Sequence, residues 1–160
     1  MPVKIGFVGA GGIANAHLSA LQAVEDVQIA AVADLDRARA ESTAARFVAR
    51  AYPDAKDMLA SERLDALYVC VPPYAHDDQE LLAAEKGIHL FVEKPVSVSL
   101  EKAREVRAAV RKSKIVTAVG YHWRYQSSTD RARQALKGRK ISMVLGYWMG
   151  GFPGVLWWRR

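Results

Sequence analysis

Short apolar runs alternate with longer amphipathic segments along most of the chain. The apolar runs are too short for buried helices and predict strands at residues 3–8, 27–33, 66–71, 89–92 and 115–120. Between them, apolar residues recur at helical spacing and predict helices at about 13–24, 36–48, 54–60, 76–86 and 100–113. This alternation favours a right-handed, doubly wound parallel sheet, so the expected fold class is α/β.

The first strand runs directly into a glycine-rich turn, in the stretch VKIGFVGAGGIA. Gly9, Gly11 and Ala14 match the dinucleotide pattern G-x-G-x-x-A, whose glycines allow a tight turn and a close approach of pyrophosphate to the backbone. The helix that follows would direct its first N–H groups toward that phosphate. We therefore predict a Rossmann nucleotide site that includes Gly9, Gly11, Gly12 and Ile13.

Asp34 ends the second predicted strand, where a carboxylate accepts hydrogen bonds from the adenosine ribose hydroxyls. Its charge would repel a 2′-phosphate, which favours NAD over NADP as the cofactor. Arg37 and Arg39 are close enough in the sequence to weaken this preference, so NADP stays open as the alternative. Asp36 is expected to cap the next helix. The other interpretation, a glycine turn and a surface aspartate in an unrelated α/β protein, is disfavoured by the strand and helix pattern.

The 160 residues suffice for about one domain with a sizeable core. No apolar run approaches the roughly 18 residues of a membrane span and no cleavable signal pattern begins the chain, so a cytoplasmic protein without membrane partners is expected. The single cysteine, Cys70, excludes a disulfide within the chain and is expected in the core. No metal site is expected.

Charge is distributed unevenly along the chain, whose formal net charge is +6. Residues 1–100 carry 9 Lys and Arg against 14 Asp and Glu, whereas residues 101–160 carry 14 against 3. Such a basic block is compatible with nucleic-acid binding. Because no nucleic-acid motif accompanies it, we favour the solvated outer faces of two helices, and nucleic acid is not an expected partner.

Three loops follow predicted strands and carry polar or reactive side chains. Their sequences are VPPYAH, EKP and GYHWRY. In doubly wound sheets, ligands lie outside the carboxyl ends of the strands. We therefore expect the three loops to converge near the nicotinamide end of a dinucleotide.

The glycine motif, Asp34, VPPYAH, GIHLFVEKPVSVSLEKA and GYHWRY together resemble the Gfo/Idh/MocA family, named for glucose-fructose oxidoreductase, inositol dehydrogenase and a rhizopine-catabolism protein. The resemblance covers essentially the first 125 residues, and the spaced EKP motif is its most specific part. It implies an N-terminal Rossmann domain, a C-terminal α/β domain and NAD(P)-dependent oxidation or reduction of a sugar, inositol or related polyol.

By the same resemblance, Lys94 is the catalytic lysine that contacts the reacting hydroxyl or carbonyl and assists proton transfer. An ammonium beside a positively charged nicotinamide ring releases its proton more readily, which supports this role. Pro95 would fix the backbone that aims Lys94, with a cis peptide bond as one way to do so. Glu93 is expected to orient this loop or the cofactor ribose, and His17 is expected to be structural. The plain alternative for Lys94 is an ordinary surface lysine.

Residues of the other two loops join the predicted site by resemblance. Pro72 and His76 are expected beside the cofactor, although capping or packing explains His76 nearly as well. His122 and Trp123 are assigned to the substrate, and Arg124 to the cofactor. The chain departs from the family here, because Trp123 and Arg124 stand in place of an arginine pair. The identity of the substrate therefore does not carry over.

Residues 1–125 are expected to form the nucleotide-binding domain. Residues 126–160 are expected to form a linker helix at 128–136 and a strand at 141–149 that resembles the first strand of a C-terminal substrate domain. The catalytic histidine of the family comes from that domain and has no counterpart here, so we expect a truncated oxidoreductase that binds nucleotide with little turnover. An unpaired strand favours pairing with another copy or disorder, and a homo-oligomer is expected.

Two alternatives stay open at this point. The chain could be a non-catalytic dinucleotide-binding or sensing module that associates through its basic, aromatic C-terminal segment. The family also includes NAD-dependent glycosidases that use transient oxidation, and the sequence does not choose between that route and net oxidation.

Overall fold

Six parallel strands form one sheet in the first of two compact units, Met1–Gly120, of the computed structural model. The structure describes residues 1–147, 149 and 150. The strand order across the sheet is β3-β2-β1-β4-β5-β6. The strands are β1 (Val3–Val8), β2 (Val27–Ala33), β3 (Arg50–Tyr52), β4 (Ala66–Val69), β5 (His89–Val92) and β6 (Thr117–Val119). Because the order reverses between β1 and β4, the sheet is doubly wound and the predicted α/β class is confirmed.

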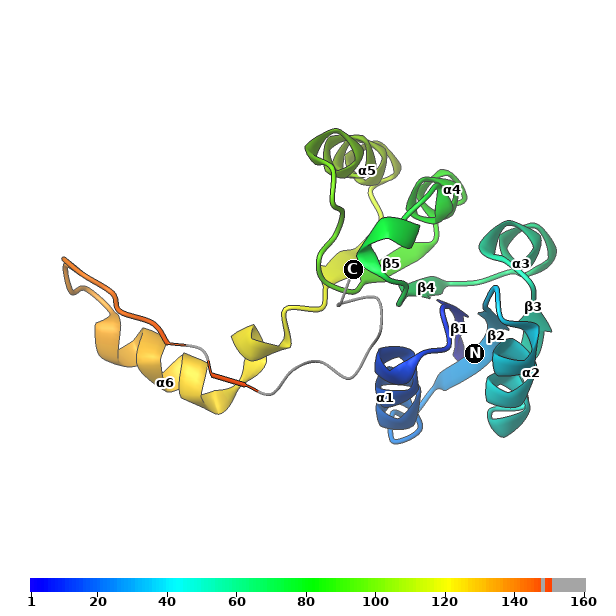
Figure 1. The fold of residues 1–160 in the computed structure, drawn as a ribbon, viewed down its shortest axis with the longest axis horizontal. Helices are drawn as coiled ribbons and strands as arrows, with labels where there is room; N and C mark the ends of the chain where they lie inside the picture. The colour runs from blue at the N-terminus through cyan, green and yellow to red at the C-terminus, as the bar shows by residue number, and fades with distance from the viewer. Residues whose placement is uncertain (148, 151–160) are drawn as a thin grey trace. The chain divides into compact units, whose positions relative to one another are not determined.

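Helices cover both faces of this sheet. They are α1 (Gly12–Leu21), α2 (Arg37–Arg46), α3 (Ala55–Ser61), α4 (Gln79–Glu85) and α5 (Leu100–Ser113). Figure 1 shows α1 and α2 on one face, and α3, α4 and α5 on the other. One buried cluster includes Phe7 and Leu18 on the α1 face, and a second includes Met58 and Leu67 on the opposite face. Burial on both faces explains why the central strands read as continuous apolar runs.

Polar side chains begin several helices. Asp36 accepts a hydrogen bond from the backbone N–H of Arg39 at 3.1 Å and caps α2, as predicted. Asp54 and Ser99 cap α3 and α5 in the same way. These caps explain why the chain leaves each preceding strand or loop and enters a helix at that residue.

One helix start and one edge strand of this unit differ from what the sequence predicts. The helix predicted at 76–86 is wrong at its start, because α4 begins at Gln79 after the 3-10 turn η1 (Pro73–Ala75). The Gln79 side chain binds the intervening backbone: its Nε2 donates to the Ala75 carbonyl at 2.9 Å and its Oε1 accepts from the Asp77 N–H at 3.0 Å. The sequence pattern also does not predict β3, because this edge strand has only 3 residues and no apolar run.

The second unit begins at Tyr121 and contains η2 (His122–Tyr125) and α6 (Ser127–Leu136), which confirms the helix predicted at 128–136. The predicted strand at 141–149 is wrong for the residues described there, which form no strand; Trp148 lies outside them. A strand needs a hydrogen-bonded neighbour, and the described part of this unit contains no strand to pair with. No helix in the described ranges is both long and apolar enough to cross a bilayer.

Candidate nucleotide-binding and catalytic site

The turn between β1 and α1 requires glycine at one position and leaves space at two others. Gly9 has a φ of +89°, and a Cβ on it would lie 2.5 Å from the carbonyl oxygen of Cys70. A Cβ on Gly11 or Gly12 would meet no atom of the described residues within 4 Å. Packing therefore requires glycine only at position 9. Gly11 and Gly12 instead leave open space at the start of α1.

The N-terminus of α1 is suited to an anion. Gly11 is its N-cap residue, no side chain among the described residues caps its first turn, and that turn carries no acidic residue. The Asn15 amide instead donates to the carbonyl oxygens of Ala10 and Gly11, at 2.9 and 3.0 Å. Ile13, in the first turn, is exposed. Free N–H groups and the positive end of the helix dipole stabilise a phosphate at such a position, so a pyrophosphate fits this turn.

The carboxylate of Asp34 lies beside the glycine turn at the end of β2. Its Oδ2 accepts the Ala10 N–H at 2.8 Å and Arg39 Nε at 3.1 Å. Its Oδ1 accepts the Asp36 N–H at 2.9 Å and Arg39 Nη2 at 3.0 Å. The glycine turn and the predicted ribose-binding carboxylate are therefore joined by one hydrogen bond, and Arg39 covers both carboxylate oxygens.

Arg39, rather than Arg37, is the arginine that contacts Asp34. The Arg39 side chain is 50% exposed, while that of Asp34 is 10% exposed. Arg37 instead pairs with Glu41 on its own helix at 2.8 Å. The sequence names both arginines and does not choose between them, because the choice depends on how α2 is rotated against the end of β2.

The EKP loop follows β5. Lys94 is exposed, and its bond to Pro95 is cis, the geometry that the sequence suggests. Glu93 is buried, its Oε2 accepts the backbone N–H of Lys94 at 3.1 Å, and its Oε1 lies 2.7 Å from Nε2 of His17. Glu93 therefore holds the loop from inside the protein while the Lys94 amine faces solvent.

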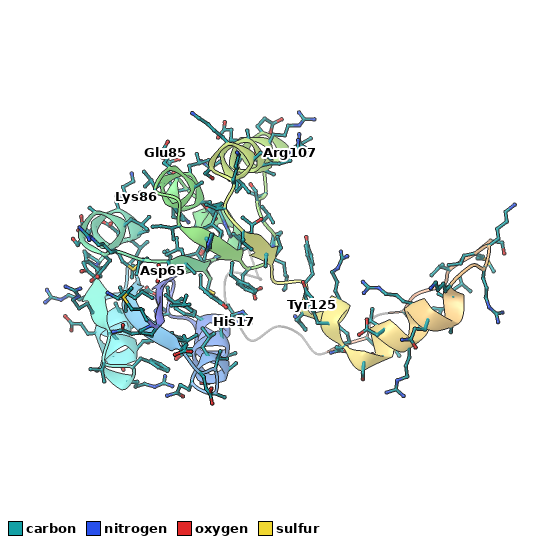
Figure 2. All side chains as sticks on the ribbon, turned by 180° about the vertical axis from the view of Figure 1, so that it is seen from behind. His17, Asp65, Glu85, Lys86, Arg107 and Tyr125 are labelled. Carbon is teal, nitrogen blue, oxygen red and sulfur yellow. The ribbon has the colours of Figure 1, made fainter. Side chains whose placement is uncertain are left out.

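His17 lies on α1 against the sheet (Figure 2). Its ring centroid is 5.6 Å from that of Tyr68 and 4.9 Å from that of Phe91. Tyr68 stacks on both Phe7 and Phe91, at 4.7 and 4.6 Å. The pairing of His17 with Glu93 is a feature that sequence reasoning misses, although each residue is noticed separately.

Cys70 lies close to Glu93 and is buried. Burial, and then the charge of Glu93, raise the pKa of the Cys70 thiol from its ordinary 9.0 to about 12. A thiol that holds its proton so firmly is a core residue rather than a nucleophile, as predicted. Within the described ranges, no group of three or more His, Cys, Asp or Glu side chains could hold a metal ion.

In the loop after β4, the His76 side chain is buried against Glu80 of α4. His76 Nδ1 lies 2.6 Å from Glu80 Oε1, and the two side chains are 3% and 2% exposed. Among the described residues, Glu80 Oε2 has no hydrogen-bond partner. Burial of the side chain is compatible with packing, the alternative considered for His76, and its assignment to the cofactor stays a prediction. Pro72 precedes η1 at the start of the same loop and is half-buried.

The remaining predicted residues, His122, Trp123 and Arg124, lie in η2 of the second unit and are exposed. The rings of His122 and Trp123 are 5.7 Å apart, and the Trp123 carbonyl accepts a hydrogen bond from Thr129 Oγ1 at 2.7 Å. These contacts fix the turn itself. The assignment of the three residues to substrate or cofactor stays a prediction.

A six-stranded parallel sheet in this order, a glycine turn before α1 and a carboxylate at the end of β2 define a dinucleotide-binding Rossmann domain. Within that class, the chain belongs to the Gfo/Idh/MocA family. The model of this family, described as an oxidoreductase family with an NAD-binding Rossmann fold, matches residues 3–121. The match confirms the resemblance found in the sequence, and the NAD-binding description of the family confirms NAD as the expected cofactor.

Curated relatives and solved structures agree with this assignment. The chain is 28% identical over 142 residues to glucose-6-phosphate 3-dehydrogenase of Bacillus subtilis strain 168, covering 89% of this chain and 40% of that protein. It is 33% identical over 150 residues to inositol 2-dehydrogenase/D-chiro-inositol 3-dehydrogenase of Lacticaseibacillus casei, covering 91% and 42%. The WlbA dehydrogenase of Chromobacterium violaceum, solved with NADH and UDP-GlcNAcA, matches with a TM-score of 0.80 at 28% identity, covering 85% and 40%. The chain thus spans well under half the length of these proteins.

Proposed function

We propose that this chain is the nucleotide-binding part of an NAD-dependent oxidoreductase that acts on a sugar, inositol or related polyol, with NADP as the alternative cofactor. The observation that carries the proposal is the hydrogen bond of the Ala10 N–H to Asp34, which unites the glycine turn and the acidic residue in one site. Relatives named as sugar and inositol dehydrogenases support the substrate class.

NAD⁺ held at this site would supply a hydride acceptor for the substrate carbon that bears the hydroxyl. In the proposal, the amine of Lys94 takes the hydroxyl proton as the carbonyl forms and returns it in the reverse direction. Its position directly after β5 supports this role, since ligands of doubly wound sheets lie outside the carboxyl ends of the strands. Cofactor binding is assigned to Gly9, Gly11, Gly12, Ile13, Asp34, Pro72, His76, Glu93, Lys94, Pro95 and Arg124, and substrate binding to Lys94, His122 and Trp123.

The proposal includes a homo-oligomer in the cytoplasm, with residues 1–125 as the nucleotide domain and 126–160 as the start of a substrate domain. Large apolar side chains exposed in the second unit, such as Met143, Leu145 and Tyr147, support association with another protein surface. Cys70, a free and buried thiol, is compatible with a reducing compartment.

Calorimetric titration of the purified chain with NADH tests the proposal. Saturable binding is expected, and Asp34→Ala should weaken it by about tenfold or more, because hydrogen bonds to a charged acceptor are lost. Asp54→Ala is the matched control, since Asp54 caps α3 as an aspartate outside the predicted site. Lack of binding of both NADH and NADPH, or an equal loss in the two variants, would count against the proposal.

A further inference from the structure

The carboxylate of Glu93 contacts three segments that are far apart in the sequence. Its Oε1 lies 2.7 Å from His17 Nε2 on α1, and its Oε2 accepts the Lys94 N–H at 3.1 Å. Gly120, directly after β6, leaves no room for a side chain: a Cβ there would lie 2.5 Å from Oε1 and 2.8 Å from Oε2. Helix α1, the Lys94 loop and the end of β6 therefore meet at one carboxylate.

The histidine that binds this carboxylate is itself held in place. Its ring packs on Tyr68 and Phe91, which stack on each other across β4 and β5. A ring fixed by packing presents its Nε2 at one position, as a supporting residue of a functional site must do. Cys70, also near Glu93, stays a neutral thiol.

We propose that His17 is a positioning residue for Lys94. It fixes the Glu93 carboxylate, which in turn holds the Lys94 backbone N–H. Because α1 also begins at the glycine turn, the helix that receives the pyrophosphate and the loop that carries the Lys94 amine become one connected unit. This inference rests on the proposed function, in which Lys94 moves the proton.

Amide hydrogen exchange at Lys94, followed by NMR without nucleotide, tests the connection directly. His17→Phe keeps a ring for packing but removes the nitrogen that faces Glu93, and exchange at Lys94 should accelerate about tenfold. His17→Gln places an amide nitrogen near the Nε2 position and should restore most of the protection. Tyr68→Phe is the matched control, because it alters the same aromatic cluster and leaves the Glu93 contacts in place; exchange at Lys94 should not change.

Gly120→Ala perturbs the same carboxylate from the end of β6. Its Cβ would displace Glu93, so the same selective acceleration at Lys94 is expected while amides within β4 and β5 stay protected. The inference is overturned if folded His17→Phe and Gly120→Ala both leave Lys94 exchange unchanged. It is also overturned if exchange rises equally throughout the sheet, which is the result of a merely structural role.

Acylation of lysines by acetic anhydride, with and without saturating NADH, measures where the Lys94 amine lies. NADH should protect Lys94 in the unmodified chain and in His17→Gln, and this protection should be lost in His17→Phe; exposed Lys86 is the internal reference. Protection retained in His17→Phe contradicts the inference. If the unmodified chain fails to bind NADH, the proposed function fails, while the amide-exchange result still decides whether His17 positions the loop.

Discussion

Asp34 and Glu93 occupy comparable places but are held in different ways. Each directly follows a parallel strand, and their side chains are 10% and 8% exposed. Asp34 is covered by Arg39, five residues along the chain and 50% exposed. Glu93 is bound by His17, 76 residues away and 25% exposed. An exposed arginine can move aside for a ligand at little cost, whereas a packed ring cannot, so one end of the site can exchange partners and the other keeps a fixed geometry.

The largest expected effect concerns the reactivity of Cys70, the buried thiol near Glu93. With the pKa of Cys70 raised to about 12, its thiolate fraction at pH 8 falls on the order of 1,000-fold below that of an ordinary cysteine. Reaction with Ellman's reagent at pH 8 should therefore be slower by about that factor in the folded chain than in urea. A fast reaction under native conditions would show that the surroundings of Glu93 are as accessible to solvent as those of Asp34.

The same shift has a consequence for stability at alkaline pH. Because the folded pKa of Cys70 lies above the unfolded value, its contribution is complete below about pH 9 and is lost as the pH rises toward about 12. Urea unfolding at pH 8 and pH 10.5 should show a smaller alkaline loss of stability in Cys70→Ala than in the unmodified chain. An identical loss of stability in both proteins would show that other titrating groups cause the alkaline effect.

Replacing each carboxylate by alanine sharpens the comparison at the level of stability. Glu93→Ala leaves His17 Nε2 and the Lys94 N–H without their acceptor inside the protein, and about 3 kcal/mol of unfolding free energy should be lost. Asp34→Ala frees Arg39, which is exposed enough to be hydrated, and removes the acceptor of the Ala10 and Asp36 N–H groups, so a loss of about 2 kcal/mol is expected. Urea denaturation without nucleotide measures both values. Equal losses would mean that Asp34 is as structural as Glu93.

The parts of the site that the sequence predicts depend on local geometry. G-x-G-x-x-A and Asp34 are each defined by a strand end and the residues next to it, and the Ala10 to Asp34 bond unites them. The pairing of His17 with Glu93 depends on β1, β4 and β5 being neighbours, which no local pattern encodes. Over its described residues, the predicted strand at 141–149 fails for a related reason, because a strand exists only with a partner.

The smallest expected effect tests whether Arg39, the partner of Asp34, contributes to the choice between NADH and NADPH. Arg39 binds both oxygens of Asp34 and so places a positive charge at the position where a 2′-phosphate would be repelled. Removing it in Arg39→Ala should lower affinity for NADPH about fivefold, since an exposed ion pair is worth up to about 1 kcal/mol, and leave NADH binding equal or slightly stronger.

Arg37→Ala is the matched control for this change, because Arg37 lies on the same helix and pairs with Glu41 instead. Titrations with NADH and NADPH at low and at high salt give the ratio of the two dissociation constants, and the effect of Arg39→Ala should shrink as salt is added. If Arg39→Ala weakens both nucleotides equally, the arginine only supports the shape of the turn. If the ratio of the NADH and NADPH dissociation constants changes in Arg39→Ala and not in Arg37→Ala, Asp34 and its exchangeable partner Arg39 take part in selecting the cofactor.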